Sequence, residues 1–256
     1  MSRPINTLSA IYPVLLRSDL PHDEADAYWA GPHAELVKRG GHIMEYNQYH
    51  LSRTDVGYWP ATPTVGVTPD PAFRWDGVTE VRLASFTEMA RAAYGMLDTI
   101  FRDEQNVFDN VLGHVCGPGG ARWWTPTHDP TVGHRTVLML RRRRGHSYRA
   151  FRSFVHTTFG PALDAAGARD VRTYTFLPFT GVAHRTPGTS HIHPPSHRHH
   201  GAIIFGLPDR TAIDGLLESP TIRAVITEQA THLTAVHAYG VDRTVPVIGP
   251  VIGEIA

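Results

Sequence analysis

A short stretch near the start of the chain gathers side chains that could transfer protons. Trp29 and His33 lie four residues apart in a segment with a helical pattern, so both are expected on one face of that helix. In the strand-like segment that follows, side chains alternate between two faces, and Tyr46, Gln48 and His50 share one of them. If that face lies under the helix, two imidazoles, a phenol and an amide surround one place. This set suits general acid–base catalysis near neutral pH.

Three further residues are candidates for the same site. Asp109, on a predicted helix, would accept a ring N–H of His33 or His50 and so orient that histidine; the alternative is a solvated or capping carboxylate. Trp123 and Trp124 are adjacent on a predicted strand and therefore face opposite ways. One is expected to line the pocket or pack in the core, and the other to cover the junction between the two halves of the chain.

Two long loops also draw attention. Residues 183–201 hold six histidines, and the spacing of His191 with His193, or of His197 with His199, could bring two imidazoles to a zinc or copper ion. Two prolines and the lack of nearby cysteine or carboxylate instead favour a mobile loop with adventitious metal binding. Residues 53–75 form a long Pro/Thr-rich loop, which has the length of a lid. The basic run at 141–144 is interpreted as a solvated strand end.

The elements that must position these residues repeat once along the chain. Each half is predicted to run strand, helix, strand, strand, helix, strand, which is the order of a ferredoxin-like unit. The predicted segments of the first half are 11–18, 22–40, 42–52, 77–86, helical sequence at 87–97 and 101–115, and 121–128. Those of the second half are 135–143, 147–167, 171–179, 201–208, helical sequence at 209–218 and 221–233, and 234–248. His33 precedes His156 by 123 residues, and Gly77 precedes Gly201 by 124. The repeat predicts an α+β fold of two tandem units, 1–124 and 125–256.

Several motifs of the first half resemble one known family. They are Tyr28-Trp29 with the following PHAEL, the Y-x-Q-x-H at 46–50, DGVTEVRLASFTEMARAAYG from Asp76, and FRDEQNVFDN from Phe101. Together they resemble the EthD family of the dimeric α/β-barrel superfamily over residues 11–124. The second half resembles the superfamily in architecture alone, because Arg152 stands where the first half has Trp29 and no Y-x-Q-x-H follows.

The resemblance implies a barrel with helices outside and a pocket between sheet and helices, usually without an organic cofactor. Because two units are fused, the dimer of single-unit relatives becomes intramolecular, and no further dimer is required. The superfamily includes cofactor-free monooxygenases, muconolactone isomerases, polyketide cyclases, and haem-binding peroxidases and chlorite dismutases. EthD-like members of fungal polyketide pathways are associated with decarboxylation or dehydration.

The leading hypothesis is therefore an acid–base lyase or isomerase that acts on an aromatic or polyketide-like small molecule. His33 would be the base, with His50 and Asp109 in support, while Tyr46 and Gln48 hold a substrate carbonyl and the developing enolate. Trp29, Gln48, Trp123 and Trp124 would contact the substrate. The alternatives are an oxygenase, either cofactor-free or with haem on an axial histidine, and a non-catalytic binding protein.

Composition excludes several other classes. The 256 residues are 41% hydrophobic and 19% charged, with a formal net charge of zero, which fits a globular protein without a broad basic surface for nucleic acid. No apolar run is long enough to span a bilayer, and the single Cys116 fits a reducing cytoplasm. No phosphate-binding glycine loop or G-x-S-x-G elbow is present. We expect a cytoplasmic enzyme with no metal, membrane or nucleic-acid partner.

Overall fold

The computed structural model describes residues 4–125, 129, 131–178 and 186–249. The elements of the first half follow the predicted order, with the last strand divided into short pieces. They are β1 (Ile5–Leu16), α1 (His22–Tyr28), the π-helical turn η1 (Trp29–His33), α2 (Ala34–Arg39), β2 (Glu45–Val56), the 3-10 turn η2 (Pro71–Phe73), β3 (Gly77–Leu83), α3 (Phe86–Glu104), β4 (Phe108–Val111), β5 (His114–Val115) and β6 (Ala121–Trp123).

The second half repeats the order of strands and helices. Its elements are β7 (His134–Arg142), α4 (Tyr148–Ser153), the π-helical turn η3 (Phe154–Phe159), α5 (Gly160–Ala165), β8 (Arg169–Thr175), β9 (Gly201–Leu207), α6 (Ala212–Glu218), α7 (Pro220–His232) and β10 (Leu233–Ile248). In both halves the first helical segment contains a Gly-Pro pair at or beside a π-helical turn. Proline has no N–H to donate, which favours a local change of the helical hydrogen-bond pattern at that point.

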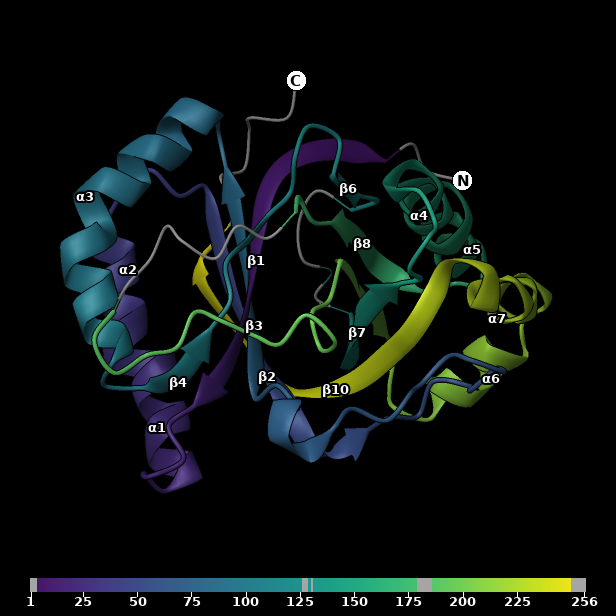
Figure 1. The fold of residues 1–256 in the computed structure, drawn as a ribbon, viewed down its shortest axis with the longest axis horizontal. Helices are drawn as coiled ribbons and strands as arrows, with labels where there is room; N and C mark the ends of the chain where they lie inside the picture. Colours follow the sequence, from purple (N-terminus) through teal and green to yellow (C-terminus); the bar gives the residue numbers. More distant parts are fainter. Residues whose placement is uncertain (1–3, 126–128, 130, 179–185, 250–256) are drawn as a thin grey trace.

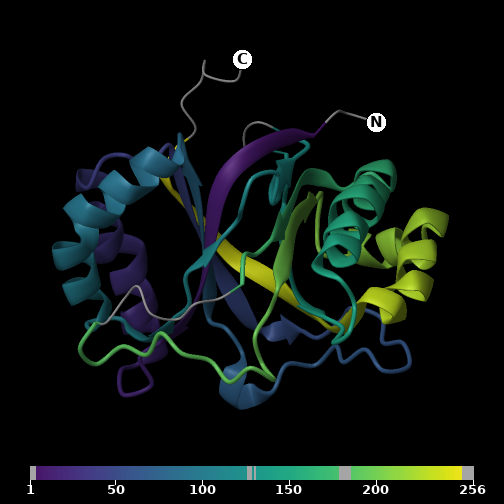
Figure 2. The same cartoon turned by 45° about the horizontal axis from the view of Figure 1, so that its top comes forward.

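The strands of both halves form one closed antiparallel barrel. The order around the described barrel is β1-β3-β2-β10-β7-β9-β8-β6 and back to β1, which makes eight strands, with β4 and β5 paired to β1 beside this ring. The long strand β10 joins the halves because it pairs with β2 on one side and β7 on the other. Figures 1 and 2 show the barrel in the centre, with α1 to α3 on one side and α4 to α7 on the other.

One predicted helix is shorter than expected. The prediction of continued helix over residues 101–115 is wrong beyond Glu104, because residues 108–111 and 114–115 are strands. Val111 pairs with Val14, and His114 with Ile11, on β1. The start of α3 is marked by Ser85, whose side chain accepts a hydrogen bond from the backbone N–H of Glu88. Strand pairing with β1 thus overrides the helical pattern after Glu104.

The inside of the barrel carries a buried charge network at one end. Arg172 is completely buried, and it donates hydrogen bonds to Glu80 (2.7 Å), Glu45 (3.3 Å) and Asp170 (3.0 Å). Its guanidinium also lies 4.1 Å from the ring of Trp123. Several carboxylates therefore share one buried cation, and this arrangement links strands of both halves.

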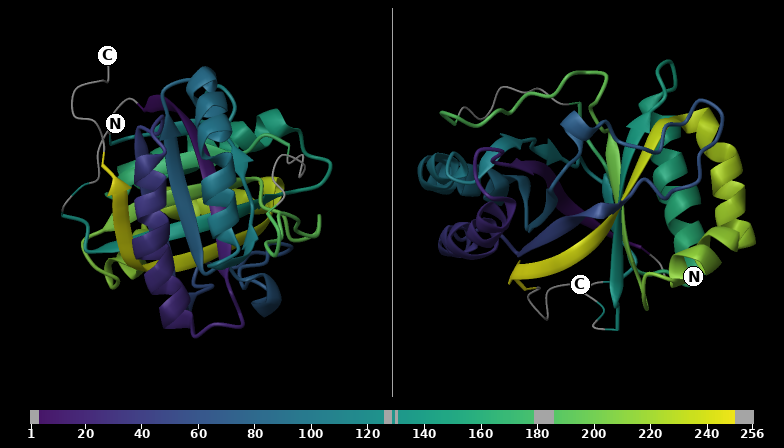
Figure 3. Two further views of the ribbon diagram at one scale, coloured as in Figure 1. Left: turned by 90° about the vertical axis from the view of Figure 1, so that its left-hand side faces the viewer. Right: turned by 90° about the horizontal axis from the view of Figure 1, so that it is seen from below.

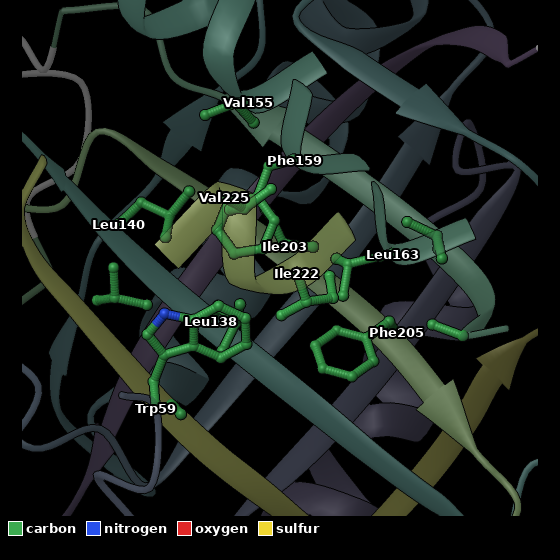
Figure 4. Close-up of a cluster of buried hydrophobic side chains, with 14 of the residues drawn as sticks. Trp59, Leu138, Leu140, Val155, Phe159, Leu163, Ile203, Phe205, Ile222 and Val225 are labelled. Carbon is green, nitrogen blue, oxygen red and sulfur yellow. The ribbon is translucent and has the colours of Figure 1, made fainter. Parts of the chain in front are cut away.

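Two loops exchange sides between the halves. The first-half loop after β2 places Trp59 in the apolar core of the second half, where its indole N–H donates to Gln229 (2.9 Å). Figure 4 shows Trp59 beside Leu138 and below the helices that carry Phe159 and Val225. In return, residues 186–191 of the second half lie along β4 and the end of α3. The loop of residues 53–75, whose length predicted a lid, instead anchors Trp59 in the core of the opposite half.

Candidate functional site

The face of the first-half sheet that lies under the helices carries a polar row. Cross-strand pairing places Tyr12 on β1 opposite Thr79 on β3, and Thr79 opposite Gln48 on β2. The next row holds Val14, Gly77 and His50. Figure 3 (left) shows the helices of this half lying across these strands. The predicted alternation of residues 46, 48 and 50 toward the helices is confirmed by the Gln48 and His50 contacts described below.

The π-helical turn η1 places the rings of Trp29 and His33 against that face of the sheet. Trp29 is completely buried over Gly77, where an added Cβ would lie 2.2 Å from the indole ring. Only glycine leaves room for this indole, so the glycine that opens β3 has a packing reason. The side-chain N–H of Gln48 donates to the carbonyl oxygen of Trp29 (2.9 Å), and the rings of Trp29 and His50 lie 4.2 Å apart. The π-helical turn and strand β2 therefore bring Trp29, Gln48 and His50 together at one buried place.

His33 is held by a carboxylate that the sequence did not reveal. Its Nδ1 lies 2.8 Å from Oδ2 of Asp103 near the end of α3, and both residues are buried. Tyr28 (2.6 Å) and Asn106 (3.2 Å) donate to the other oxygen of Asp103. Burial alone raises the pKa of Asp103, but the hydrogen bonds from His33, Tyr28 and Asn106 outweigh it and lower the pKa. An ionised Asp103 keeps the proton on Nδ1 and leaves Nε2 of His33 as the basic nitrogen.

His50 has its own carboxylate. Its Nδ1 hydrogen-bonds Asp26 of α1, and Arg243 of β10 donates to the same carboxylate (2.5 Å). Burial lowers the pKa of His50, although the bond to Asp26 opposes this. His33 and His50 are therefore oriented by different acids, and β10 of the second half reinforces the second pair.

Glu104 introduces a buried acid next to this cluster. It is 6% exposed and accepts a hydrogen bond from the hydroxyl of Thr186 (3.1 Å), which comes from the second half. Nε2 of His191 lies 3.7 Å from the same oxygen. Burial raises the pKa of Glu104 to about 8, and the neighbouring Asp103 adds to the rise while Thr186 opposes it. Glu104 is therefore mostly protonated at neutral pH, which is unusual for a carboxyl group and typical of functional sites.

Two phenols border the same region. Burial raises the pKa of Tyr46 to about 12, and hydrogen bonding with Thr79 and Gln48 opposes the rise. Burial of its hydroxyl, with smaller contributions from Glu104 and Tyr46, likewise raises the pKa of Tyr12 to about 12. Both phenols remain protonated at neutral pH and are able to donate hydrogen bonds.

Three buried polar atoms at this place make no hydrogen bond of normal geometry with the described residues, although the side chains of Trp29 and Gln48 lie near the hydroxyl of Tyr46. They are Nε1 of Trp29, Oε1 of Gln48 and Nε2 of His50. A buried polar atom without a partner costs about 1–3 kcal/mol, so proteins rarely gather several without use. A polar ligand between the sheet and the helices would supply a donor and acceptors for them.

The structure corrects the prediction for Asp109. This residue lies on β4 rather than on a helix, and its carboxylate accepts a hydrogen bond from the backbone N–H of Ser18 (2.9 Å). The acids that orient His33 and His50 are Asp103 and Asp26 instead. The alternative interpretation of Asp109 as a capping carboxylate agrees with this contact.

The two adjacent tryptophans face opposite ways, as predicted. Trp123 points into the barrel beside Arg172, whereas Trp124 packs in the core of the second half. Trp124 lies so close to Gly160 that an added Cβ there would be 2.5 Å from its ring. Neither indole contacts His33, so their predicted contact with substrate stays a prediction, and the place of each is that of a core residue.

The histidine-rich segment is an irregular loop whose side chains are partly buried. His191 lies 3.0 Å from the carbonyl of Val111 through Nδ1, and His197 lies 4.0 Å from the ring of Phe73. The side chains of His193 and His199 are only 1% and 5% exposed. In a solvated loop these side chains would be exposed. Within the part of the chain that the structure describes, no group of three or more His, Cys, Asp or Glu side chains is arranged to hold a metal ion. His184 lies outside the described residues.

The corresponding place in the second half has different chemistry. His156 is buried, and both ring nitrogens contact hydroxyls, those of Thr173 (2.7 Å) and Thr175 (3.0 Å). Phe151, rather than Arg152, lies over Gly201 as Trp29 lies over Gly77. The assignment of Arg152 to the position of Trp29 is therefore wrong; Arg152 donates to the carbonyl of Pro118 (2.8 Å) instead.

Sequence reasoning missed Asp103, Glu104, Asp26 and Thr186. The first two lie in a helix whose acidic residues read as a solvated face, and the last comes from the other half of the chain. Only the aromatic and histidine spacing in residues 28–50 gave a usable signal.

Comparison with known proteins gives the fold but no close relative. No protein-family model matches the chain, and no match is found among curated proteins. A proposed monooxygenase from Fusobacterium nucleatum superposes with a TM-score of 0.59 at 7% identity, over 96% of both chains. A proposed monooxygenase from Lactobacillus acidophilus superposes with a TM-score of 0.56 at 10% identity, over 96% of this chain and 99% of that one. The protein therefore has the α+β fold of the dimeric α/β-barrel proteins, with an antiparallel eight-stranded barrel among its described residues.

Proposed function

We propose that the first half is the active half of an acid–base enzyme, a lyase or isomerase of EthD type that uses no organic cofactor. The observation that carries the proposal is the buried His33–Asp103 pair beside unpartnered polar atoms of Trp29 and Gln48. A histidine oriented by a carboxylate, next to idle donors and acceptors, is equipped to remove a proton from a bound molecule. The aromatic surroundings favour an aromatic or polyketide-like substrate.

The reaction would begin at a C–H bond next to a carbonyl group. Nε2 of His33 takes the proton, the electron pair of that bond moves into the carbon framework, and the carbonyl oxygen becomes an enolate oxygen. The protonated phenol of Tyr46 and the indole N–H of Trp29 would stabilise that oxygen by donating hydrogen bonds. Asp103 stabilises the imidazolium that forms.

Glu104 would supply the second proton. Because it holds a proton at neutral pH, it can protonate a departing hydroxyl in a dehydration, or a carbon atom in an isomerisation. Loss of carbon dioxide would need the same carbanion stabilisation and a final protonation. An acid and a base with separated pKa values are the usual requirement of these reactions.

The oxygenase hypothesis shares the first step. The superposed proteins from Fusobacterium nucleatum and Lactobacillus acidophilus are named as monooxygenases, and an enolate of an electron-rich substrate can react with oxygen directly. Oxygen consumption during turnover separates this activity from a lyase or isomerase. A binding protein without activity would bind the same molecules and release them unchanged.

A haem group fits the second half poorly. Both ring nitrogens of His156 contact threonine hydroxyls, and the space between sheet and helices is filled by Trp59, Phe154 and Phe159. An axial ligand needs a free ring nitrogen, and a porphyrin needs the volume that these rings occupy. We assign no step to haem.

Proton exchange on a simple ketone tests the proposal. β-Tetralone is an enolisable cyclic ketone fused to an aromatic ring, and NMR in D2O follows the loss of its α-protons. His33→Ala should lower the enzyme-dependent exchange rate by about 100-fold or more. His42→Ala is the matched control, because His42 is exposed and bonded to Glu88, and it should leave the rate unchanged. Exchange by His33→Ala within a few-fold of wild type would contradict the assignment.

We also propose that residues 1–124 and 125–256 are two ferredoxin-like units of a tandem repeat, so that the chain needs no second copy to complete the barrel. None of the described helices is long and apolar enough to cross a membrane. Light scattering during size-exclusion chromatography should give the mass of one chain. A stable dimer would contradict the proposal that the chain needs no second copy.

A further inference from the structure

Two sequence features that the proposed function does not use meet at one end of the barrel. The arginine run begins at Arg141 on β7, which points to the inside of the barrel like Val137 and Met139 two and four residues earlier. His237 and Tyr239 of the neighbouring β10 pair with Met139 and Val137, so they lie on the same inner face. The histidine-rich loop covers this end, which we call the histidine end.

The loop is fastened to the barrel through its histidines. Nε2 of His199 lies 3.0 Å from Nδ1 of His237, and Trp75 donates to the other nitrogen of His199 (3.5 Å). The ring of His193 stacks on Trp75 with centroids 4.8 Å apart. His200 accepts a hydrogen bond from the backbone N–H of Arg142 (3.3 Å). The histidine end is therefore a built arrangement with buried members rather than a solvated loop.

The charge at the histidine end is positive and unbalanced. Arg141 is half-buried, and within the described residues it makes no ion pair and no hydrogen bond through its side chain. Arg142 contacts the backbone of His146, and Arg198 donates to the carbonyl of His193 (2.8 Å). The positive charge of Arg141 reaches His193, His199, His200, His237 and Tyr239.

The nearest negative charge is already engaged. Asp76 acts on Tyr239, but its carboxylate accepts a hydrogen bond from the backbone N–H of Leu16 (2.9 Å) and lies 3.7 Å from His22. Arg74, which also acts on Tyr239, adds a further positive charge. His114 faces the end from β5 and stacks on Phe176. A half-buried guanidinium without a counter-ion costs free energy, and a bound anion would offset this cost.

Polar atoms without a partner mark the same place. The hydroxyl of Tyr239, Nε2 of His193 and Nε of Arg141 are shielded from solvent and make no hydrogen bond of normal geometry with described residues. Tyr239 is 0% exposed and His193 is 1% exposed. The Tyr239 hydroxyl and the Arg141 Nε–H are donors, and a protonated His193 would be a third. Three donors beside an uncompensated cation match the oxygen atoms of an anion.

We propose that the histidine end of the barrel is a binding site for a small oxyanion, either inorganic or the carboxylate of an aromatic acid. Arg141 supplies the charge and Tyr239 and His193 supply hydrogen bonds. Trp75 and Phe73 flank His193, with Phe73 4.8 Å from it, and would contact the ring of an aromatic acid. Because the site lies inside the barrel, it is separate from the place between sheet and helices where His33 lies.

Anion binding at the histidine end is coupled to protons. Burial, together with the positive charges of Arg141 and of neighbouring histidines, lowers the pKa of His193 and of His237 to about 4. A bound anion places a negative charge near these histidines, which favours their protonated forms and raises their pKa values. The complex then takes up a proton at mildly acidic pH, so affinity should increase as the pH falls toward 6.

Sulfate is a suitable probe because its charge is constant over this range. Isothermal titration at constant ionic strength should give saturable binding at pH 6 that is about tenfold weaker at pH 8. Arg141→Gln should weaken sulfate binding by about tenfold or more. Arg144→Gln is the matched control from the same run, since Arg144 is exposed, and its affinity should stay within about twofold of wild type. Equal weakening by both variants, or no saturable binding by wild type, overturns the proposal.

A second variant keeps the test decisive if Arg141→Gln fails to fold. Tyr239→Phe removes one buried hydroxyl and should weaken sulfate binding by about threefold or more. Wild-type affinity in Tyr239→Phe would overturn the assigned contact. Competition with benzoate identifies the source of the oxyanion: displacement of sulfate by benzoate at much lower concentration indicates an aromatic acid, and poor competition indicates an inorganic anion.

Discussion

The two halves share one frame and fill it with opposite chemistry. The row Tyr12, Thr79 and Gln48 in the first half corresponds to Leu138, Ile203 and Thr173 in the second, because each row lies two residues from the glycine that accepts an aromatic ring. In the first half the row is polar and lies beside His33. In the second half two of its three members are aliphatic, and the third binds His156. The same order of strands and helices therefore carries polar side chains under the helices in the first half and mainly apolar ones in the second.

The exchanged loops deepen this difference. Trp59 fills the second half with an indole, whereas Thr186 brings a hydroxyl to the buried acid of the first half. The connection between the second and third strands therefore has a different role in each half. The first-half loop fills the second half with apolar volume, and the second-half loop adds a polar contact to the first half. Four experiments can break or sharpen the comparison, in order of decreasing effect.

Acid should destabilise the protein mainly through the second half. The histidines at 193, 200 and 237 have pKa values of about 4 in the folded protein and about 6.5 when unfolded. Between these two pKa values the unfolded chain binds more protons than the folded protein. The free energy of unfolding therefore increases with pH in this range, and this stability is lost as the pH falls from about 6.5 to 4. Each such histidine contributes about 1.4 kcal/mol per pH unit. Urea unfolding from pH 7 to pH 5 measures the slope.

A single substitution shows where that slope comes from. His237→Asn removes one of the titrating groups and should reduce the slope by about 1 kcal/mol per pH unit. His42→Asn, at an exposed first-half position, is the control. An unchanged slope in His237→Asn would locate the acid sensitivity elsewhere.

Trp59→Ala should destabilise the second half. Loss of the buried indole leaves a cavity against Phe159 and Leu138 and removes the hydrogen bond to Gln229, at a cost of about 3–5 kcal/mol. Trp59→Phe retains most of the volume and should cost less than half as much. Chemical denaturation provides the measurement, and a cost below about 1 kcal/mol for Trp59→Ala would show that the loop does not support the core.

The paired histidines should separate activity from stability. His33→Ala is expected to lower turnover by about 100-fold, whereas His156→Ala should stay within a few-fold of wild type. His156→Ala instead removes a hydrogen-bond partner from each of two threonine hydroxyls, which keep only long contacts to backbone carbonyls, and should reduce stability by about 1–3 kcal/mol. Exchange rates and urea midpoints for both variants give the ranking. The reverse ranking would mean that the active half has been assigned wrongly.

Thr186→Val should have the smallest effect. It removes the hydroxyl that bonds Glu104, raises the pKa of that acid, and should change turnover by only about threefold to tenfold. Thr189→Val is a matched control from the same loop, because Thr189 donates to the backbone of Phe108 instead. A pH–rate profile in which the two variants coincide would remove Thr186 from the site.

Local pattern predicted much of the fold and part of the site. The alternation through Tyr46, Gln48 and His50 is encoded by neighbouring residues, so the sequence reveals it. The start of α3 was misplaced by one residue, because Ser85 was assigned to the preceding strand although it caps the helix. Asp103 was not predictable, because its partner His33 is 70 residues away and meets it only when α3 packs on η1. The end of α3 was misjudged because β4 exists through pairing with β1. The buried Arg172 network is hidden for the same reason: two of its three acids, Glu80 and Glu45, lie 92 and 127 residues away.

The pairing of β10 with β2 has a consequence for synthesis of the chain. Val245 pairs with Gln48, so the strand that carries the candidate site obtains its second neighbour only after residues 233–248 have left the ribosome. Until then the edge of β2 that pairs with β10 has no partner strand. Such distant contacts slow folding and prolong the life of exposed edges. A stalled nascent chain that ends before residue 233 would therefore display an incomplete first half and depend on chaperones to avoid aggregation.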